Sequence, residues 1–285
     1  MKMDLECVAC LLNQTYKALS RINVSREVKE KLLRKALEIV ASNSWSLSSP
    51  QLYFRIYKLI RLESGINDPY QHDKKTWNKK ALELYDELKQ AIIKSNDPLY
   101  TSLKLAIAGN IIDFGALDRF DVEKTIQESL EKPLTIDDYL LFKEKLRTAT
   151  SILYFMDNAG EAIFDRLFIE EIVKYGISKV CLVVREEPFI NDVTIADLDD
   201  TGILSISEVE VLTMPVDPEK FEYYEREGVI KSWIKSNDLV IAKGQGNLEI
   251  LDKYEDIFFA LIVKCNAVAR YLGVNVGDMI FRYNI

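Results

Sequence analysis

The sequence predicts an α/β protein in which an all-helical region precedes a parallel β-sheet covered by helices on both faces. Residues 1–149 carry apolar side chains at helical spacing, whereas from residue 150 short apolar runs rich in β-branched residues alternate with helical patterns. Strands that alternate with helices form parallel sheets. Because no flexible linker marks the change, we expect an all-helical domain over residues 1–149, packed tightly on an α/β domain over residues 150–285.

Capping residues divide the helical region. Ser25 is placed to cap the second helix, Ser49 and Pro50 open a third that ends at Gly65, and Asp97 with Pro98 starts a later one. Four of the expected helices cover residues 5–19, 26–40, 49–64 and 98–112. Between the third and fourth of these we expect a long helix of about 20 residues that includes Trp77 and Ile92. A last helix is expected to start near 135–138 and to end near 148.

Five strands and five helices are expected after residue 150. The strands cover residues 152–156, 179–184, 209–212, 239–242 and 258–263. The helices cover roughly residues 161–175, 194–200, 218–236, 247–253 and 266–272, bounded by signals such as Gly176, Pro218 and Gly273.

The charge distribution and the apolar content of the sequence argue against a nucleic-acid-binding or membrane-spanning protein. The net charge of −8 divides into +3 over residues 1–150 and −11 over residues 151–285, so neither half has the basic character of a nucleic-acid binder. No apolar run reaches the length of a membrane span, and the acidic N-terminus does not resemble a signal peptide, so we expect a cytoplasmic protein. Four cysteines in 285 residues do not make a disulfide framework.

Polar residues lie in the segments that follow four of the expected strands. Asp157 and Asn158 end the first, Asp192 lies after the second, the 243–247 loop follows the fourth, and Lys264 follows the fifth. Because the carboxyl ends of parallel strands meet at one edge, where ligands bind, these side chains should lie together. Carboxylate and amide oxygens beside lysines fit an oxyanion held next to Mg²⁺ or Mn²⁺ better than a zinc site.

Each of these residues also has a purely structural interpretation. Asp157 is suited to cap the following helix, and Asp192 to sit in a turn before a capped helix. The loop with Gly244 and Gly246 can present N–H groups to phosphate, but it lacks the full phosphate-loop pattern. Lys264 can simply extend into solvent from the end of an apolar strand. We favour the functional interpretation because all four strand ends are polar together.

An ordered set of motifs over nearly the whole chain resembles the domain of unknown function eighty-nine family, the damage-control metal phosphatases, in its archaeal branch. The motifs are CxxC at Cys7 and Cys10, DPY at 68–70 with Lys74 and Asn78, AGNIID at 108–113, DNAGE at 157–161, NDVT at 191–194, KGQGN at 243–247 and KC at 264–265.

The resemblance implies a Rossmann-like three-layer α/β/α sandwich with a helical N-terminal region, and hydrolysis of small phosphorylated metabolites with a divalent metal ion, Mg²⁺ or Mn²⁺, with Co²⁺ or Ni²⁺ as further options. The positions that match the family's metal ligands are Asp157, Asn158 and Asp192. Lys243 and Asn247 match positions in the phosphate pocket, and Asn110 and Asp113 match a helical motif that faces the same cleft. We therefore expect Asp157, Asp192 and Lys243 to be catalytic, with substrate binding by Asn110, Asp113, Lys243, Gly244, Gly246, Asn247 and Lys264.

Two other function classes remain open from the residues alone. A methyltransferase-like enzyme also uses such a sheet, but its first turn usually needs more glycine than DNAG offers. A metabolite-binding protein without turnover is the second. In the phosphatase, either water or Asp157 is the attacking group, and Ala159 disfavours the dehalogenase-type mechanism, which needs an Asp there. We expect no nucleic acid or membrane partner. For Cys7 and Cys10 helix packing is favoured, with a metal or redox role left open.

Overall fold

The computed structural model describes residues 1–109 and 119–284. Over these residues the centre of the molecule is a seven-stranded sheet with the order β1-β7-β6-β5-β2-β3-β4. All neighbouring strands are parallel except β6 and β7, which are antiparallel. The strands are β1 (Ile136–Asp137), β2 (Ser151–Phe155), β3 (Lys179–Arg185), β4 (Val209–Met214), β5 (Leu239–Lys243), β6 (Ile257–Ile262) and β7 (Met279–Asn284).

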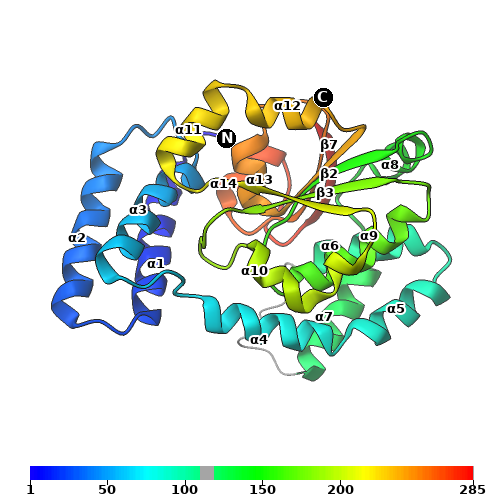
Figure 1. Cartoon of the computed structure of the whole chain (residues 1–285), viewed down its shortest axis with the longest axis horizontal. Helices are drawn as coiled ribbons and strands as arrows, with labels where there is room; N and C mark the ends of the chain where they lie inside the picture. Colours follow the sequence, from blue (N-terminus) through cyan, green and yellow to red (C-terminus); the bar gives the residue numbers. More distant parts are fainter. Residues whose placement is uncertain (110–118, 285) are drawn as a thin grey trace.

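Helices cover both faces of this sheet (Figure 1). Those before β2 are α1 (Leu5–Arg21), α2 (Arg26–Ser42), α3 (Ser49–Ser64), α4 (Gln71–Leu82), α5 (Tyr85–Lys94), α6 (Pro98–Ala108), α7 (Arg119–Glu131) and α8 (Tyr139–Leu146). Those after β2 are α9 (Glu161–Val173), α10 (Ile195–Leu198), α11 (Pro218–Arg226), α12 (Val229–Lys235), α13 (Gly244–Leu251) and α14 (Asn266–Leu272). The predicted α/β class is confirmed, and all five predicted strands form.

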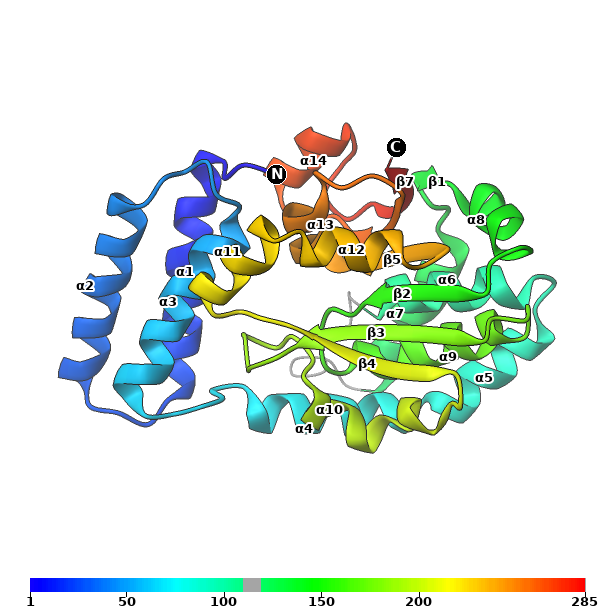
Figure 2. The same cartoon turned by 45° about the horizontal axis from the view of Figure 1, so that its top comes forward.

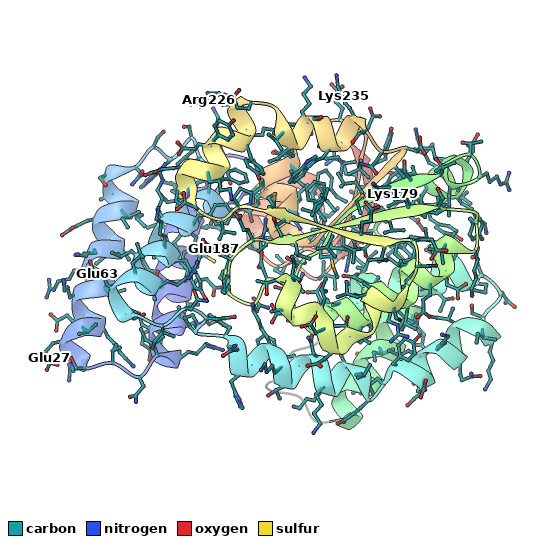
Figure 3. All side chains as sticks on the ribbon, in the orientation of Figure 1. Glu27, Glu63, Lys179, Glu187, Arg226 and Lys235 are labelled. Atoms are coloured by element: carbon teal, nitrogen blue, oxygen red, sulfur yellow. The ribbon has the colours of Figure 1, made fainter. Side chains whose placement is uncertain are left out.

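The alternation of side chains along β2 explains the two helical layers. Leu153 and Phe155 belong to a core shared with α1–α3 and α11–α14. Ile152 and Tyr154 belong to a second core shared with α6, α8 and α9. All four are fully buried, as expected for a strand of a parallel sheet covered on both sides. Figure 3 shows that the labelled charged residues Glu27, Arg226 and Lys235 project from the outside of the molecule.

Segments from residues 1–149 take part in both cores. Helices α6 and α8 pack on one face of the sheet, and β1 pairs with β7 at its edge. Helices α1–α3 stand together at one end of the molecule (Figure 2). Over the described part of the chain, no helix combines the length and the apolar character needed to cross a membrane.

The structure corrects several element boundaries. Strand β7 was not expected, and residues 136–137, expected to start a helix, form the short strand β1 instead. The long helix expected around Trp77 and Ile92 is divided into α4 and α5, and the one expected over 218–236 is divided at Gly228, whose φ is 70°. A positive φ interrupts helical geometry, and glycine adopts it without steric cost.

Candidate active site

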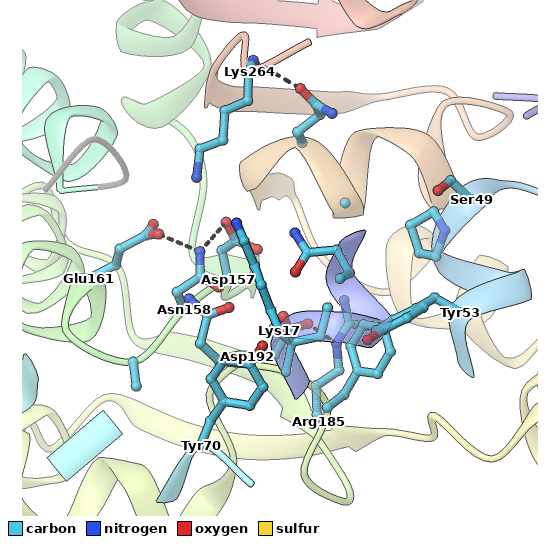
Figure 4. Close-up of a pocket in the computed structure, with 18 of the residues that line it drawn as sticks. Lys17, Ser49, Tyr53, Tyr70, Asp157, Asn158, Glu161, Arg185, Asp192 and Lys264 are labelled. Atoms are coloured by element: carbon cyan, nitrogen blue, oxygen red, sulfur yellow. Dashed lines mark hydrogen bonds and ion pairs between the residues drawn. The ribbon is translucent and has the colours of Figure 1, made fainter. Parts of the chain in front are cut away.

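The strand order places a crevice at the carboxyl end of β2. From β2 the chain proceeds to β3 and β4 on one side, whereas β5, β6 and β7 lie on the other. Ligands bind in α/β sheets at such a reversal of strand order. A cavity of about 730 Å³ opens there, and helices α1 and α3 form its opposite wall (Figure 4). That volume accommodates a small metabolite.

Asp157, Asn158 and Asp192 come together in this cavity. An isolated β-bridge joins Asn158 to Asp192, and the Val193 N–H donates to the Asp157 carbonyl at 2.9 Å. These backbone bonds hold the turn after β2 beside the loop after β3. Both carboxylates are buried, so charge at this site is poorly screened by water.

The side chain of Asn158 connects the two acidic residues of the DNAGE motif. Its Nδ2 donates to Asp157 Oδ2 at 2.8 Å and to Glu161 Oε1 at 2.6 Å. In this orientation, assigned from the hydrogen bonds, Oδ1 is the atom left to bind a cation. Burial, followed by the charge of Asp157, raises the pKa of Glu161 to about 8. Glu161 lines the cavity next to the two aspartates.

Arg185, at the end of β3, is a buried cation beside Asp192. Its Nε donates to Asp192 Oδ2 at 2.6 Å, and its Nη2 donates to Asn247 Oδ1 at 3.1 Å. Burial raises the pKa of Asp192 to about 6, although Arg185 opposes this shift. Asn247 in turn donates to the backbone carbonyls of Met156 and Lys243 at 2.9 and 2.7 Å. Asn247 therefore joins the ends of β2 and β5 rather than facing the cavity.

Lys243 lies in a layer below the cavity floor. Its side chain is fully buried, and its Nζ donates to Asp165 Oδ1 at 2.6 Å and lies 3.6 Å from Glu161 Oε2. Asp165 also accepts a 2.7 Å hydrogen bond from the Tyr154 hydroxyl. Although burial lowers the pKa of Lys243, Asp165 and Glu161 together raise it above its ordinary value. Lys243 is not among the residues that line the cavity.

Gly244 is the point of closest approach between the β5 loop and Asp157. Its φ is +77°, and a Cβ added there would lie 2.0 Å from Asp157 Oδ2. Only glycine satisfies both conditions. The KGQGN loop can therefore lie this close to Asp157 only because Gly244 has no side chain.

The predicted site residues fall into three groups. Those that line the cavity are Asp157, Asn158, Asp192, Gly246 and Lys264. Those that lie behind this lining are Lys243, Gly244 and Asn247. The last two, Asn110 and Asp113, lie outside the described residues. The alternative in which Asp157 merely caps a helix is wrong, because the N-cap of α9 is Gly160, three residues further along the chain.

Sequence reasoning missed several residues of the cavity. No role was predicted for Arg185, although a charged residue directly after an apolar strand, seven positions before Asp192, is itself a signal. Lys17 and Tyr53, from α1 and α3, and Tyr70, just before α4, line the wall opposite the sheet. The apolar residues around them predict helices but do not predict that these helices cover the cavity. The position of a helical layer over the edge of a sheet is set by tertiary packing.

The donor set at the front of the cavity fits a hard divalent cation. Asp157 and Asp192 supply carboxylate oxygens and Asn158 an amide oxygen, ligands typical of Mg²⁺ or Mn²⁺. Among the described residues no group of three or more His, Cys, Asp or Glu is arranged to hold a metal ion. A site of two carboxylates and one amide is consistent with an ion that keeps several of its waters, as Mg²⁺ does.

This combination defines the class of protein: an α/β protein with an acidic, oxygen-rich cavity at the reversal of its strand order. The sequence model of one protein family, the damage-control phosphatase ARMT1-like domain, matches residues 3–280. The chain therefore belongs to that family. The resemblance drawn from the motifs is thereby confirmed.

Relatives from three archaea are similar over nearly their whole length. A damage-control phosphatase of Pyrococcus horikoshii is 30% identical, and the alignment covers 100% of this chain and 99% of that relative. A damage-control phosphatase of Archaeoglobus fulgidus is 31% identical, with 98% of each chain covered. A protein of Methanocaldococcus jannaschii, whose name gives no function, is 34% identical. The alignment covers 98% of this chain and 94% of that relative.

A solved structure has the same fold. The crystal structure of a DUF89 family protein from Pyrococcus horikoshii matches with a TM-score of 0.86 and 30% sequence identity, and it covers 100% of both chains. The family and the names of its archaeal members support a phosphatase role for this protein.

Proposed function

We propose that this protein is a divalent-metal-dependent phosphatase that hydrolyses phosphomonoesters of small metabolites, such as sugar phosphates or damaged phospho-metabolites. One observation carries the proposal. Two carboxylates and an amide from the ends of adjacent strands meet in a metabolite-sized cavity, in a family whose archaeal members are named phosphatases. Asp157, Asn158 and Asp192 would hold Mg²⁺ or Mn²⁺, with Co²⁺ or Ni²⁺ as possible replacements.

The chemistry divides between the ion and the protein. When bound, the ion would neutralise charge on the phosphoryl oxygens and activate water for attack. We assign the attack to water, because Ala159 occupies the place where an enzyme with an aspartyl nucleophile needs its second Asp. Asp157 and Asp192 would therefore serve as ligands whose geometry is fixed by the backbone bonds between their loops.

Two lysines are placed to receive the phosphate. Lys264, at the end of β6, and Lys17, on α1, both line the cavity, and Figure 4 shows both side chains extending toward the acidic residues from different walls. Positive charge directed at the transferring group stabilises its transition state. Lys243 is proposed to act indirectly, by holding Asp165 and Glu161 in place from below.

The organic part of the substrate would lie against the wall opposite the sheet. Tyr53, Tyr70, Trp77 and Phe189 contribute aromatic surface to the cavity. Aromatic surface combined with a few fixed polar groups is typical of sites for small molecules. The mixed character of this wall favours a compact polar metabolite over a long apolar one.

The proposal is tested by phosphate release. Phosphorylated sugars and cofactors are incubated with the protein after chelator treatment and addition of Mg²⁺, Mn²⁺, Co²⁺ or Ni²⁺. We expect turnover only with added metal ion, and a loss of at least about 10²-fold in Asp157→Asn and Asp192→Asn. Asp200→Asn, which changes an exposed aspartate on the surface, is the control and should retain activity.

Binding of phosphorylated compounds without release of phosphate would favour the metabolite-binding alternative. Full activity in Asp157→Asn or Asp192→Asn would refute the assignment of the metal ligands. Equal turnover in chelator and in added metal would refute metal dependence.

A further inference from the structure

Helix α4 contacts both loops that carry the proposed metal ligands. It runs beneath the sheet next to α10, the helix that follows the Asp192 loop (Figures 1 and 2). Of the DPY motif and the residues after it, Tyr70 lines the cavity, whereas Lys74 and Asn78 have no role in the proposed reaction. Both side chains are nevertheless buried, with exposures of 0% and 6%. Burial of such polar groups is costly unless each is satisfied by specific partners.

Asn78 joins the two loops directly. Its Oδ1 accepts the Gly160 N–H at 2.6 Å, and its Nδ2 donates to the Asp197 carbonyl at 2.7 Å. Gly160 lies two residues after Asn158, in a turn with a φ of 85°. Asp197 lies on α10, five residues after Asp192. One amide side chain thus fixes the distance between the turn after β2 and the helix after β3.

Lys74 holds the same helix onto the second loop. Its Nζ lies 2.9 Å from Asp197 Oδ2 and 3.1 Å from Asp68 Oδ2. Asp197 Oδ2 also accepts the N–H of Thr194 at 2.9 Å and its hydroxyl at 2.7 Å. Thr194 follows Asp192 by two residues. The ion pair and the capping bonds therefore converge on one carboxylate oxygen, which locks α4 against the loop that carries Asp192.

We infer that Asn78 is a positioning residue for the metal site, which sets the separation of the Asp157–Asn158 turn from the Asp192 loop. This inference rests on the proposed function. Groups that hydrogen-bond directly to metal ligands typically change metal affinity by 10–100-fold when removed, and we take this as the scale for a residue that fixes the loops carrying those ligands. In this protein the effect passes through Gly160 and Asp197, because these residues are the hydrogen-bond partners of the Asn78 side chain.

The connection also reaches the substrate wall. Tyr70 and Trp77 flank Lys74 in the same segment, and both line the cavity. The segment 68–78 therefore carries part of the substrate wall and the bonds to both ligand loops. Substitution of Asn78 removes this connection more selectively than substitution of Lys74 would. Asn78 is uncharged, so its loss leaves no buried charge without a partner.

The test compares Asn78→Ala with Leu88→Ala. Leu88 is buried in the cluster that packs α5 on α9, so its truncation lowers stability without touching either ligand loop. Mn²⁺ affinity is measured by calorimetry, and melting temperature is measured in chelator. We expect Asn78→Ala to weaken Mn²⁺ binding by about 10–100-fold, and Leu88→Ala to bind Mn²⁺ like the wild type even where it melts lower.

A conservative variant supplies the rescue. Asn78→Asp keeps an oxygen at the position that accepts the Gly160 N–H, but it replaces the donor to the Asp197 carbonyl by a second oxygen and adds a carboxyl group. It is expected to bind Mn²⁺ more tightly than Asn78→Ala. Saturating Mn²⁺ is expected to restore turnover in Asn78→Ala, because the ligands themselves are intact.

The outcomes separate this inference from the proposed function. If the wild type binds no Mn²⁺ and releases no phosphate, the proposed function fails. If the wild type binds Mn²⁺ and Asn78→Ala binds it equally well, the positioning role fails. Should Asn78→Ala not fold, hydrogen exchange of the wild type decides: a Gly160 N–H held by Asn78 exchanges slowly without metal ion, whereas rapid exchange refutes the inference.

Discussion

Gly244→Ala tests how closely the β5 loop approaches the metal site. The substitution adds one methyl group at a position with φ +77°, where its Cβ would lie 2.0 Å from Asp157 Oδ2 and 2.2 Å from Asp157 Cγ. Two effects are combined: the cost of the left-handed backbone conformation, and the contact with the carboxylate. Separating them requires a second glycine with the same backbone and no neighbour.

Gly65 supplies that control. It ends α3 with φ +71°, and a Cβ added there meets nothing within 4 Å. An alanine in this conformation costs roughly 1–2 kcal/mol, so Gly65→Ala is expected to lower the melting temperature by several degrees and leave activity unchanged. Gly244→Ala bears the same backbone cost and adds the contact with Asp157.

The contact sets the magnitude of the effect on the site. Real Cβ contacts are essentially never shorter than 3.0 Å, so the separation of 2.0 Å must grow by at least 1.0 Å, through movement of Asp157 relative to the β5 loop. Functional groups tolerate displacements of about 0.5 Å, and a misplacement of 1 Å can cost about 10²-fold in rate. We therefore expect Gly244→Ala to lose about 10²-fold in phosphate release.

The assay is phosphate release at several Mn²⁺ concentrations, with thermal melting in chelator alongside. The expected pattern is a small loss of stability in both variants and a loss of Mn²⁺ affinity and turnover in Gly244→Ala alone. If Gly244→Ala binds Mn²⁺ as tightly as Gly65→Ala does, the close approach to Asp157 has no bearing on metal binding, and the reasoning is refuted.

Two further predictions concern buried charges. Burial raises the pKa of Glu249 from its ordinary 4.5 to about 7, so the folded state binds an additional proton between these values and loses stability as the pH rises through them. At about 1.4 kcal/mol per pKa unit, Glu249→Gln should stabilise the protein by about 3 kcal/mol at pH 8 and much less at pH 4.5, as measured by urea unfolding; an equal gain at both would contradict this. Lys243→Met leaves Asp165 buried without its cation, so it should cost about 3–5 kcal/mol of stability as well as activity. Lys75→Ala, on the surface of α4, should cost neither, and a fully stable Lys243→Met would show that the buried pair is unimportant.

The strand ends were predictable from the sequence because their signal is local. An apolar run that stops at Asp157 and Asn158 indicates both a buried strand and a polar edge, and parallel pairing then brings Asp192 to the same edge. The arrangement of β2 beside β3 follows from the short connection between them. This reasoning needed no knowledge of how distant helices pack.

The orientation of buried cations was not predictable in the same way. Lys243 and Lys264 both follow apolar strands, yet Lys264 lines the cavity and Lys243 turns below it to Asp165. The difference depends on the carboxylate that α9 provides one turn after Glu161, which only the folded arrangement reveals. Arg185 was missed for a similar reason, because only the folded arrangement shows that its side chain turns back to the buried Asp192.

Edge strands and interrupted helices also escaped the sequence analysis. Strand β7 ends in Arg282, Tyr283 and Asn284, so it lacks the continuous apolar pattern of a central strand, and β1 has only two residues. Both lie at one edge of the sheet, where pairing depends on the partner strand more than on local sequence. The division between α4 and α5 likewise leaves the apolar spacing nearly unchanged, and both helices pack on α9.

The most direct test of the central claim is anomalous diffraction at the manganese edge from crystals equilibrated with Mn²⁺. The account predicts one strong peak bound by Asp157, Asn158 and Asp192, at the carboxyl ends of β2 and β3 and within reach of the cavity. A peak at a different set of residues, or no peak there at Mn²⁺ concentrations that support turnover, would contradict it.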